Sequence, residues 1–408
     1  LIYKILISLT NSKKISAIGM MIFSIDVQFI YASHLARQEI VILSFLLAAL
    51  YFVISSIENW KIRNDIFVGI IIGLSAGVHP NSVFIALIIG AAYLYYIIFE
   101  KKMSVINLIV LILATGLTAS VFVGISYIFD NNFINDYLKY GDDLGATTSI
   151  VLKFFSFPDY YRKLFNTFSV TYYLPDIRLQ LILFALIVPI GLISLFIGKD
   201  GKKALLFMMA LLFLNGGYLL LGRYSQPGII FIFPLCYLLV FYLASRLKKT
   251  GFAVLVVLGV LISGSALCNI LPQANDDYSE YLSEIECSVS SDVPVLANLN
   301  TEYAFEYNML HDYRNLQNLG EMSFQEYIFS NDIKYIIYPE EMDYIYNNRP
   351  VWNVMYGNVY PYYEEMSDFL SEKCRLVHEF SSPYAMRIYM YAYDKEWAVK
   401  IYEVIDDN

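Results

Sequence analysis

Charged residues and cysteines are scarce in this 408-residue sequence. Asp, Glu, Lys and Arg make up 16% of the residues, whereas a soluble domain has about 25%. The chain has four cysteines and four histidines, and residues 272–408 show no zinc-site spacing of such ligands. That region also lacks a glycine-rich phosphate loop, a Ser-His-Asp signature and an internal repeat. These absences argue against a soluble nucleotide-binding enzyme or a zinc enzyme.

Long apolar runs take up much of the chain instead. The sequence is 58% hydrophobic, and its mean hydropathy is +0.53. Runs of about 20 apolar residues are too long and too frequent for the core helices of a soluble domain. They occur at about residues 15–33, 40–57, 66–99, 104–128, 179–197, 204–221, 228–245 and 252–271. This pattern predicts an α-helical polytopic membrane protein.

The composition changes near residue 271. Residues 1–271 hold 20 basic and 12 acidic residues, whereas residues 272–408 hold 8 basic and 25 acidic residues. We therefore expect a multi-pass transmembrane domain over residues 1–271 and a soluble extracytoplasmic α/β domain over residues 272–408. The excess of acidic residues in the second domain argues against nucleic acid as a partner.

Basic linkers between the apolar runs predict which side of the membrane each linker occupies. Lys and Arg in short linkers favour the cytoplasmic side. Such residues recur in every second linker, at Lys13/Lys14, Lys61/Arg63, Lys101/Lys102, Lys199/Lys202/Lys203 and Arg246/Lys248/Lys249. The alternate linkers, among them the segment 129–178, then lie outside. Its mixed apolar, aromatic and basic residues predict short interfacial helices or, equally well, a folded cap on the bundle.

The run 66–99 is too long to be one crossing. As a single helix it would measure about 50 Å, whereas the apolar core of a bilayer is about 30 Å thick. Proline disfavours helix at the residue before it, so His79-Pro80-Asn81 predicts a break in the middle of the run. Two passes that meet there bring the total to nine crossings in a cell-membrane protein with its C-terminal domain outside.

The C-terminal domain shows short strand and helix signals. Buried-strand patterns occur at Val293–Ala297 and Ile333–Tyr338, and further strands are expected at Arg375–Phe380 and Ala385–Tyr391. Helices are expected at Phe324–Ser330 and Tyr362–Lys373. Cys287 and Cys374 both fall in this domain, where the compartment would permit a disulfide, but the sequence leaves their pairing open.

Polar residues of the membrane domain gather at its predicted outer rim. They are Arg37, Glu39, His79, Asn81, Arg223 and Tyr224. Arginine suits a lipid phosphate, because its guanidinium stays charged and matches phosphate oxygens. Each residue taken alone is equally consistent with an ordinary helix end or rim anchor. Asp26 lies within the first span, where a carboxylate is costly, so we expect either a functional group or a structural pair with a neighbouring helix.

Three segments of the membrane domain carry a family resemblance. They are FIYASHLARQEIVILSFLLAALYF, GIIIGLSAGVHPNSVFIALIIGAAYLYY and GRYSQPGIIFIFPLCYLL. The order and spacing of Ala36-Arg37-Gln38-Glu39, His79-Pro80-Asn81 and Arg223-Tyr224-Ser225-Gln226-Pro227 resemble the GT-C superfamily of glycosyltransferases that use polyprenyl-phosphate sugars. The protein mannosyltransferase and aminoarabinose transferase branches are the most similar in pattern. The resemblance covers most of residues 1–271.

The resemblance implies an inverting sugar transfer on the outer side of the membrane. A polyprenyl-phosphate-linked sugar is the expected donor, and a protein, lipid or glycan is the expected acceptor. Arg37 and Arg223 are expected to hold the lipid phosphate and Glu39 to orient Arg37, with His79, Asn81 and Tyr224 beside the donor. Nothing in the sequence requires a cofactor or a metal, and the sequence leaves metal dependence open, because some members of the superfamily use one.

The resemblance also implies a catalytic aspartate in an outer loop that would precede Leu1. Leu1 is not an initiator methionine, and residues 1–9 have the pattern of a helix end. The chain is therefore expected to be an N-terminally truncated fragment without its catalytic base. Three alternatives stay open: a polymerase or ligase of lipid-linked glycans, a transporter, and a non-catalytic scaffold.

Overall fold

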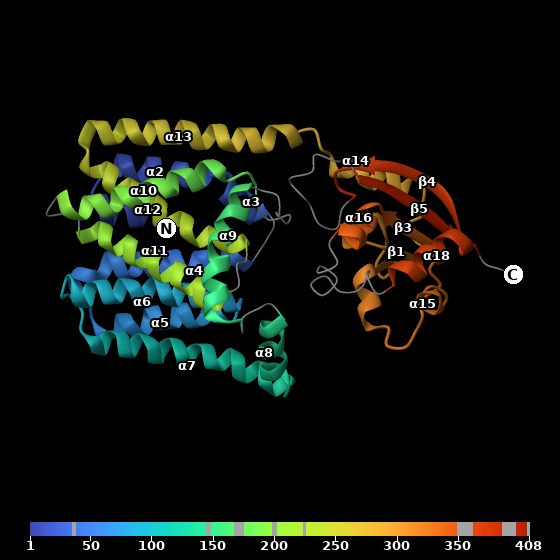
Figure 1. Cartoon of the computed structure of the whole chain (residues 1–408), viewed down its shortest axis with the longest axis horizontal. Coiled ribbons are helices and arrows are strands. Elements are labelled where there is room, and N and C mark those ends of the chain that lie inside the picture. Colours follow the sequence, from blue (N-terminus) through green and yellow to red (C-terminus); the bar gives the residue numbers. More distant parts are fainter. Residues whose placement is uncertain are drawn as a thin grey trace. The chain divides into compact units, whose positions relative to one another are not determined.

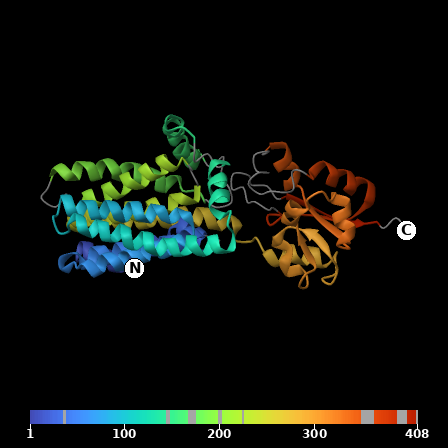
Figure 2. The same ribbon diagram turned by 90° about the horizontal axis from the view of Figure 1, so that it is seen from below.

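The computed structural model describes residues 1–34, 38–143, 148–166, 175–197, 202–222, 226–348, 362–385 and 397–405. It divides into two compact units, Leu1–Pro272 and Gln273–Asn408. The first unit is a bundle of long helices, and the second contains a β-sheet with helices around it (Figures 1 and 2).

The first unit is helical throughout its described residues. Its α-helices are α1 (Ile2–Thr10), α2 (Lys13–Ile25), α3 (Val27–His34), α4 (Gln38–Ser56), α5 (Ile62–Ala76), α6 (Val83–Ile98), α7 (Val105–Phe129), α8 (Phe133–Asp143), α9 (Ile150–Asn166), α10 (Arg178–Ile197), α11 (Lys202–Leu221), α12 (Ile232–Arg246) and α13 (Lys248–Ile270). Short 3-10 helices join some of them, at η1 (Ile57–Asn59), η2 (Pro80–Ser82), η3 (Gln226–Phe231) and η4 (Leu271–Gln273).

Seven helices of the described residues are long and apolar enough to cross a membrane. An eighth span results if α2 and α3, which meet at a 56° bend, are taken together. The ninth crossing expected from the sequence corresponds to α5. This helix has 15 residues, which gives a length of about 22 Å and leaves it short of a bilayer core of about 30 Å.

The break expected at His79 is confirmed. Helix α5 ends at Ala76, and His79 has extended backbone angles (φ −170°, ψ 148°). Its ring Nδ1 accepts a hydrogen bond from the backbone N–H of Asn81 at 3.1 Å. Because Pro80 has no N–H and disfavours helix before it, the chain restarts here as η2 and then α6.

Helices α5 and α7 pack unusually closely through small residues. Gly69, Gly73 and Gly77 are spaced by four and face α7. A Cβ atom at Gly73 would lie only 2.4 Å from the Cβ of Thr118. Such glycine repeats allow two membrane helices to approach at backbone distance, so α5 is held against α7 along its length although it is short.

The second unit is built on a mixed five-stranded sheet of order β2-β1-β3-β5-β4. Strands β1 (Val295–Ala297), β2 (Leu310–Asp312) and β3 (Tyr335–Pro339) are parallel, whereas β5 (Trp397–Val404) pairs antiparallel with β3 and with β4 (Cys374–Ser382). Its α-helices are α14 (Tyr278–Glu286), α15 (Phe324–Ser330), α16 (Glu341–Asn348) and α18 (Tyr363–Lys373), and its 3-10 helices are η5 (Leu299–Ala304) and η6 (Tyr313–Asn318).

Each face of this sheet has its own hydrophobic core. Ile336 and Tyr338 of β3 pack on one side with residues of α15 and α18. Ile337, between them, packs on the other side with residues of α14. This alternation is the period of two expected of a strand buried on both faces, and it gives the unit three layers.

Most of the expected elements of this unit are found with shifts of one or two residues. The strands expected at Val293–Ala297, Ile333–Tyr338 and Arg375–Phe380 are β1, β3 and β4, and the two expected helices are α15 and α18. The expected strand Ala385–Tyr391 lies outside the described residues except for Ala385, which is in no strand. Strands β2 and β5 were missed. Cys287 and Cys374 are free thiols.

Candidate functional site

The sequence-predicted rim residues fall into two groups. Arg37, Arg223 and Tyr224 lie outside the described residues. Glu39 is in the first turn of α4 and is only 2% exposed. Asn81 is buried at the break between α5 and α6.

The structure brings together the three segments that carry the sequence motifs. Helix α4 contacts both η2 at the break and η3. Phe84, at the start of α6, has its ring 4.5 Å from that of Tyr218 in α11 and 5.9 Å from that of Phe231 in η3. The motif segments therefore meet around Tyr218.

Tyr218 also anchors both ends of the segment that contains Arg223. Its backbone carbonyl accepts the N–H of Gly222 at 2.9 Å. Its buried hydroxyl donates to the carbonyl of Gly228 at 2.5 Å. Tyr218 thus binds the chain on both sides of residues 223–225, through its backbone at Gly222 and through its side chain at Gly228.

Lys153 of α9 is a buried cation beside this segment. Its side chain is 7% exposed, and its Nζ donates to the carbonyl of Leu220 at 2.9 Å. Its aliphatic stem lies against Gly222, where a Cβ atom would come within 2.5 Å of the lysine Cε. Gly222 itself has φ +68°, which glycine adopts without strain. Lys153 was not among the sequence-predicted site residues, although it is the one charged residue between Ser149 and Pro158.

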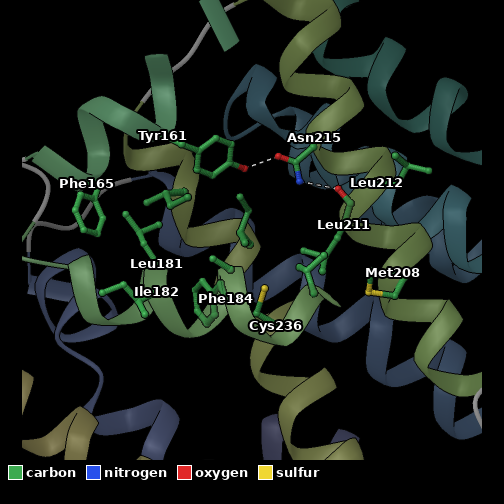
Figure 3. Close-up of a pocket in the computed structure, with 14 residues that line it drawn as sticks. Tyr161, Phe165, Leu181, Ile182, Phe184, Met208, Leu211, Leu212, Asn215 and Cys236 are labelled. Carbon is green, nitrogen blue, oxygen red and sulfur yellow. Dashed lines mark hydrogen bonds between the residues drawn. The ribbon is translucent and has the colours of Figure 1, made fainter. Parts of the chain in front are cut away.

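A large apolar pocket opens next to this region (Figure 3). It has a volume of about 580 Å³ and is lined by side chains of α9, α10, α11, η3 and α12. Its polar groups come mainly from one pair: the Tyr161 hydroxyl donates to Oδ1 of Asn215, and Nδ2 of Asn215 donates to the carbonyl of Leu211 at 2.8 Å. The other walls are hydrocarbon and sulfur, formed by Phe165, Leu181, Ile182, Phe184, Ala185, Val188, Met208, Leu211, Leu212, Ile229, Ile232 and Cys236.

A row of aromatic rings connects the pocket to the motif segments. The ring of Tyr161 lies 5.1 Å from that of Tyr160, which lies 5.8 Å from that of Tyr218. Burial raises the pKa of both Tyr160 and Tyr161, so each is a neutral phenol. Because Tyr218 touches Phe84, the row runs from the pocket to the break near Asn81.

Asp26 lies apart from this cluster in its hydrogen bonding. It is fully buried and binds Gln180 of α10 and Tyr237 of α12. It therefore joins the α2–α3 bend to α10 and α12.

Neither a metal cluster nor a known relative identifies the site. Within the described ranges, no group of three or more His, Cys, Asp or Glu residues is placed to hold a metal ion. Comparison with protein-family models gives no match, and comparison with curated proteins gives no significant relative. The chemistry of the site therefore has to be argued from its own residues.

Proposed function

We propose that this chain is part of a membrane glycosyltransferase that moves a sugar from a polyprenyl-phosphate carrier to an acceptor on the outer side, with inversion at the anomeric carbon. One observation carries the proposal. A hydrocarbon-lined pocket of about 580 Å³ is joined, through Tyr161, Tyr160 and Tyr218, to the meeting point of the three motif segments. Such an arrangement suits a ligand with a long apolar tail and a polar head.

The pocket would hold part of the isoprenoid chain. Ligand pockets of a few hundred Å³ with apolar walls bind chiefly by burying hydrocarbon. The residues of α10 and α11 that line the pocket are apolar except for Asn215. The Tyr161–Asn215 pair would mark the point where the tail gives way to the polar head.

The phosphate would lie near Lys153, Arg37 and Arg223. Lys153 holds a buried position against Gly222 and the Leu220 carbonyl. In the sequence, Arg223 directly follows Gly222, and Arg37 precedes Glu39 by two residues. The lipid phosphate is the leaving group, so fixed positive charge lowers the barrier where the negative charge develops. Glu39 would orient a cation in this cluster.

The transfer also requires activation of the acceptor hydroxyl. A carboxylate removes the proton of the acceptor hydroxyl, the oxygen attacks the anomeric carbon, and the bond to the phosphate oxygen breaks with release of polyprenyl phosphate. We assign this base to no residue of this chain.

Donor binding tests the proposal directly. The purified chain in nanodiscs is incubated with a radiolabelled polyprenyl-phosphate sugar, and bound donor is measured at equilibrium. Ala185→Trp fills the pocket, whereas Ile190→Trp places the same bulk on an exposed part of the same helix.

We expect Ala185→Trp to weaken binding at least tenfold and Ile190→Trp to leave it unchanged. Equal binding by both variants would show that the lipid tail does not occupy the pocket. No binding by the wild-type chain would remove the basis of the proposal.

A further inference from the structure

Asp26 lies at a bend inside the membrane-spanning unit. Helix α2 ends at Ile25 and α3 begins at Val27, and the two helices are bent by 56°. Asp26, which is fully buried, stands between the two helices, and its Oδ1 accepts a backbone N–H from the first turn of α3.

Neutral groups bind the Asp26 carboxylate. Oδ1 accepts the backbone N–H of Gln28 at 2.9 Å, and Oδ2 accepts the amide of Gln180 at 3.1 Å and the hydroxyl of Tyr237. In the described part of the chain, these three partners carry no positive charge. An anion buried in a membrane needs its charge balanced as well as its hydrogen bonds made.

Two more oxygen atoms belong to the residues that bind Asp26. They are Oε1 of Gln28 and Oε1 of Gln180, both on side chains at most 1% exposed. Among described residues, neither oxygen has a hydrogen-bond partner. Gln180 Oε1 shares its amide carbon with the nitrogen that donates to Asp26. A buried acceptor without a donor is costly, and such atoms require an explanation.

We infer that Asp26, Gln28 and Gln180 form a site for one alkali-metal cation, Na⁺ or K⁺. The available ligands are all oxygen atoms, which hard cations prefer. A single carboxylate balances one positive charge, and no cluster of three or more His, Cys, Asp or Glu residues supports a divalent ion in the described ranges. Broken membrane helices provide such cation sites elsewhere.

The bound cation would neutralise Asp26 and satisfy both glutamine oxygens. Because Gln180 belongs to α10 and Tyr237 to α12, the ion would also fix the α2–α3 bend against these two helices. Ion binding should therefore stabilise the native bundle through mass action, independently of any sugar transfer.

The test measures unfolding temperature and ion binding on the purified full chain. Unfolding is followed in NaCl, KCl and choline chloride at equal ionic strength, and radioactive sodium binding is measured at equilibrium, with potassium as the competitor. We expect a rise in unfolding temperature over choline that saturates with the alkali cation, and one bound ion per chain. Competition between the two ions shows which one the site prefers.

Three variants separate this site from general salt effects. Asp26→Asn and Gln180→Met should both lose the cation-dependent rise, and Gln180→Met keeps the test valid if Asp26→Asn does not fold. Asp65→Asn is the matched control, because Asp65 is also buried but takes hydrogen bonds from Trp60, Tyr93 and Asn107. It should keep the full response.

The inference would be overturned if the unfolding temperatures were equal in the three salts and no saturable sodium or potassium binding were found. The cluster around Asp26 would then hold only water. A full response in Gln180→Met would overturn it as well.

Discussion

Replacing Gly222 with alanine should displace Lys153 from its buried position. The new Cβ would lie 2.5, 2.7 and 2.8 Å from Cε, Cδ and Cγ of Lys153. Gly222 also has φ +68°, a conformation that costs other residues about 1–2 kcal/mol. Losing the bond between Lys153 and the Leu220 carbonyl adds about 1.5–3 kcal/mol, the usual range for a hydrogen bond to a charged group. We therefore expect a destabilisation of about 2.5–5 kcal/mol from these two contributions.

Thermal unfolding and donor binding in nanodiscs measure the two consequences of this change. Gly222→Ala should lower the unfolding temperature and weaken the binding of a polyprenyl-phosphate sugar. Gly216→Ala, in the helix α11 that precedes Gly222, is the matched control, because a Cβ there meets no atom within 4 Å. It should be neutral or stabilising by up to about 1 kcal/mol, since alanine favours helix over glycine.

The double variant Gly222→Ala/Lys153→Ala isolates the steric part of the effect. Removing the lysine stem makes room for the new Cβ, so the two changes should cost less together than the sum of the single changes. Strict additivity, or a Gly222→Ala chain as stable as the wild type, would refute the packing of Lys153 on Gly222.

Three further predictions concern other parts of the chain. Gly73→Ala should destabilise the bundle by about 1–3 kcal/mol through overpacking against Thr118, whereas Gly124→Ala should not, because a Cβ atom at Gly124 meets open space. Thermal unfolding of the two variants measures the difference, and equal stability would contradict the α5–α7 packing. Burial raises the pKa of Cys374 to about 12, so at pH 8 about 10⁻⁴ of this thiol is ionised. Maleimide labelling followed by peptide mass analysis should show that Cys374 reacts far more slowly than the exposed Cys287 and that its rate rises about tenfold per pH unit. Equal labelling rates would contradict the burial of Cys374. Hydrogen bonds from Arg178 lower the pKa of Asp176. Asp176 should therefore stabilise the fold above its ordinary pKa of about 3.9, and that contribution should disappear as the pH falls through the lower folded pKa. Asp176→Asn should remove this part of the acid sensitivity, and an acid-unfolding profile unchanged by the substitution would refute the prediction.

Features encoded locally could be predicted from the sequence. His79-Pro80 marks the helix break because proline restricts its predecessor and lacks an N–H. The capping box that begins α15 at Ser323 and Glu326 lies directly before an apolar run, and the expected helix has the bounds that the structure shows. The spacing of Gly69, Gly73 and Gly77 is visible in the sequence, but only the structure shows that α7 is the helix they face.

Features that depend on distant residues could not be predicted. Tyr237 and Gln180 bind Asp26 across 211 and 154 positions of sequence, and no local pattern indicates that pairing. Strand β2 has three residues, too few for an alternating pattern. Strand β5 does largely alternate between buried and partly buried residues, and the expectation of a strand at Ala385–Tyr391 did not extend to it.

The position of Lys153 was also beyond local reasoning. A lysine within an apolar and aromatic helix has the pattern of an interfacial residue with its charge in water. The structure instead buries it against Gly222 and the end of α11. Only the packing of α9 on α11 distinguishes the two outcomes.

The most direct test of the central proposal is the fate of a radiolabelled polyprenyl-phosphate sugar mixed with the purified native protein in nanodiscs and a set of protein, lipid and glycan acceptors. We predict that free polyprenyl phosphate is released, that the sugar appears on one acceptor class with inverted anomeric configuration, and that Gly222→Ala slows both. A donor that stays intact at saturating occupancy with every acceptor would contradict the account.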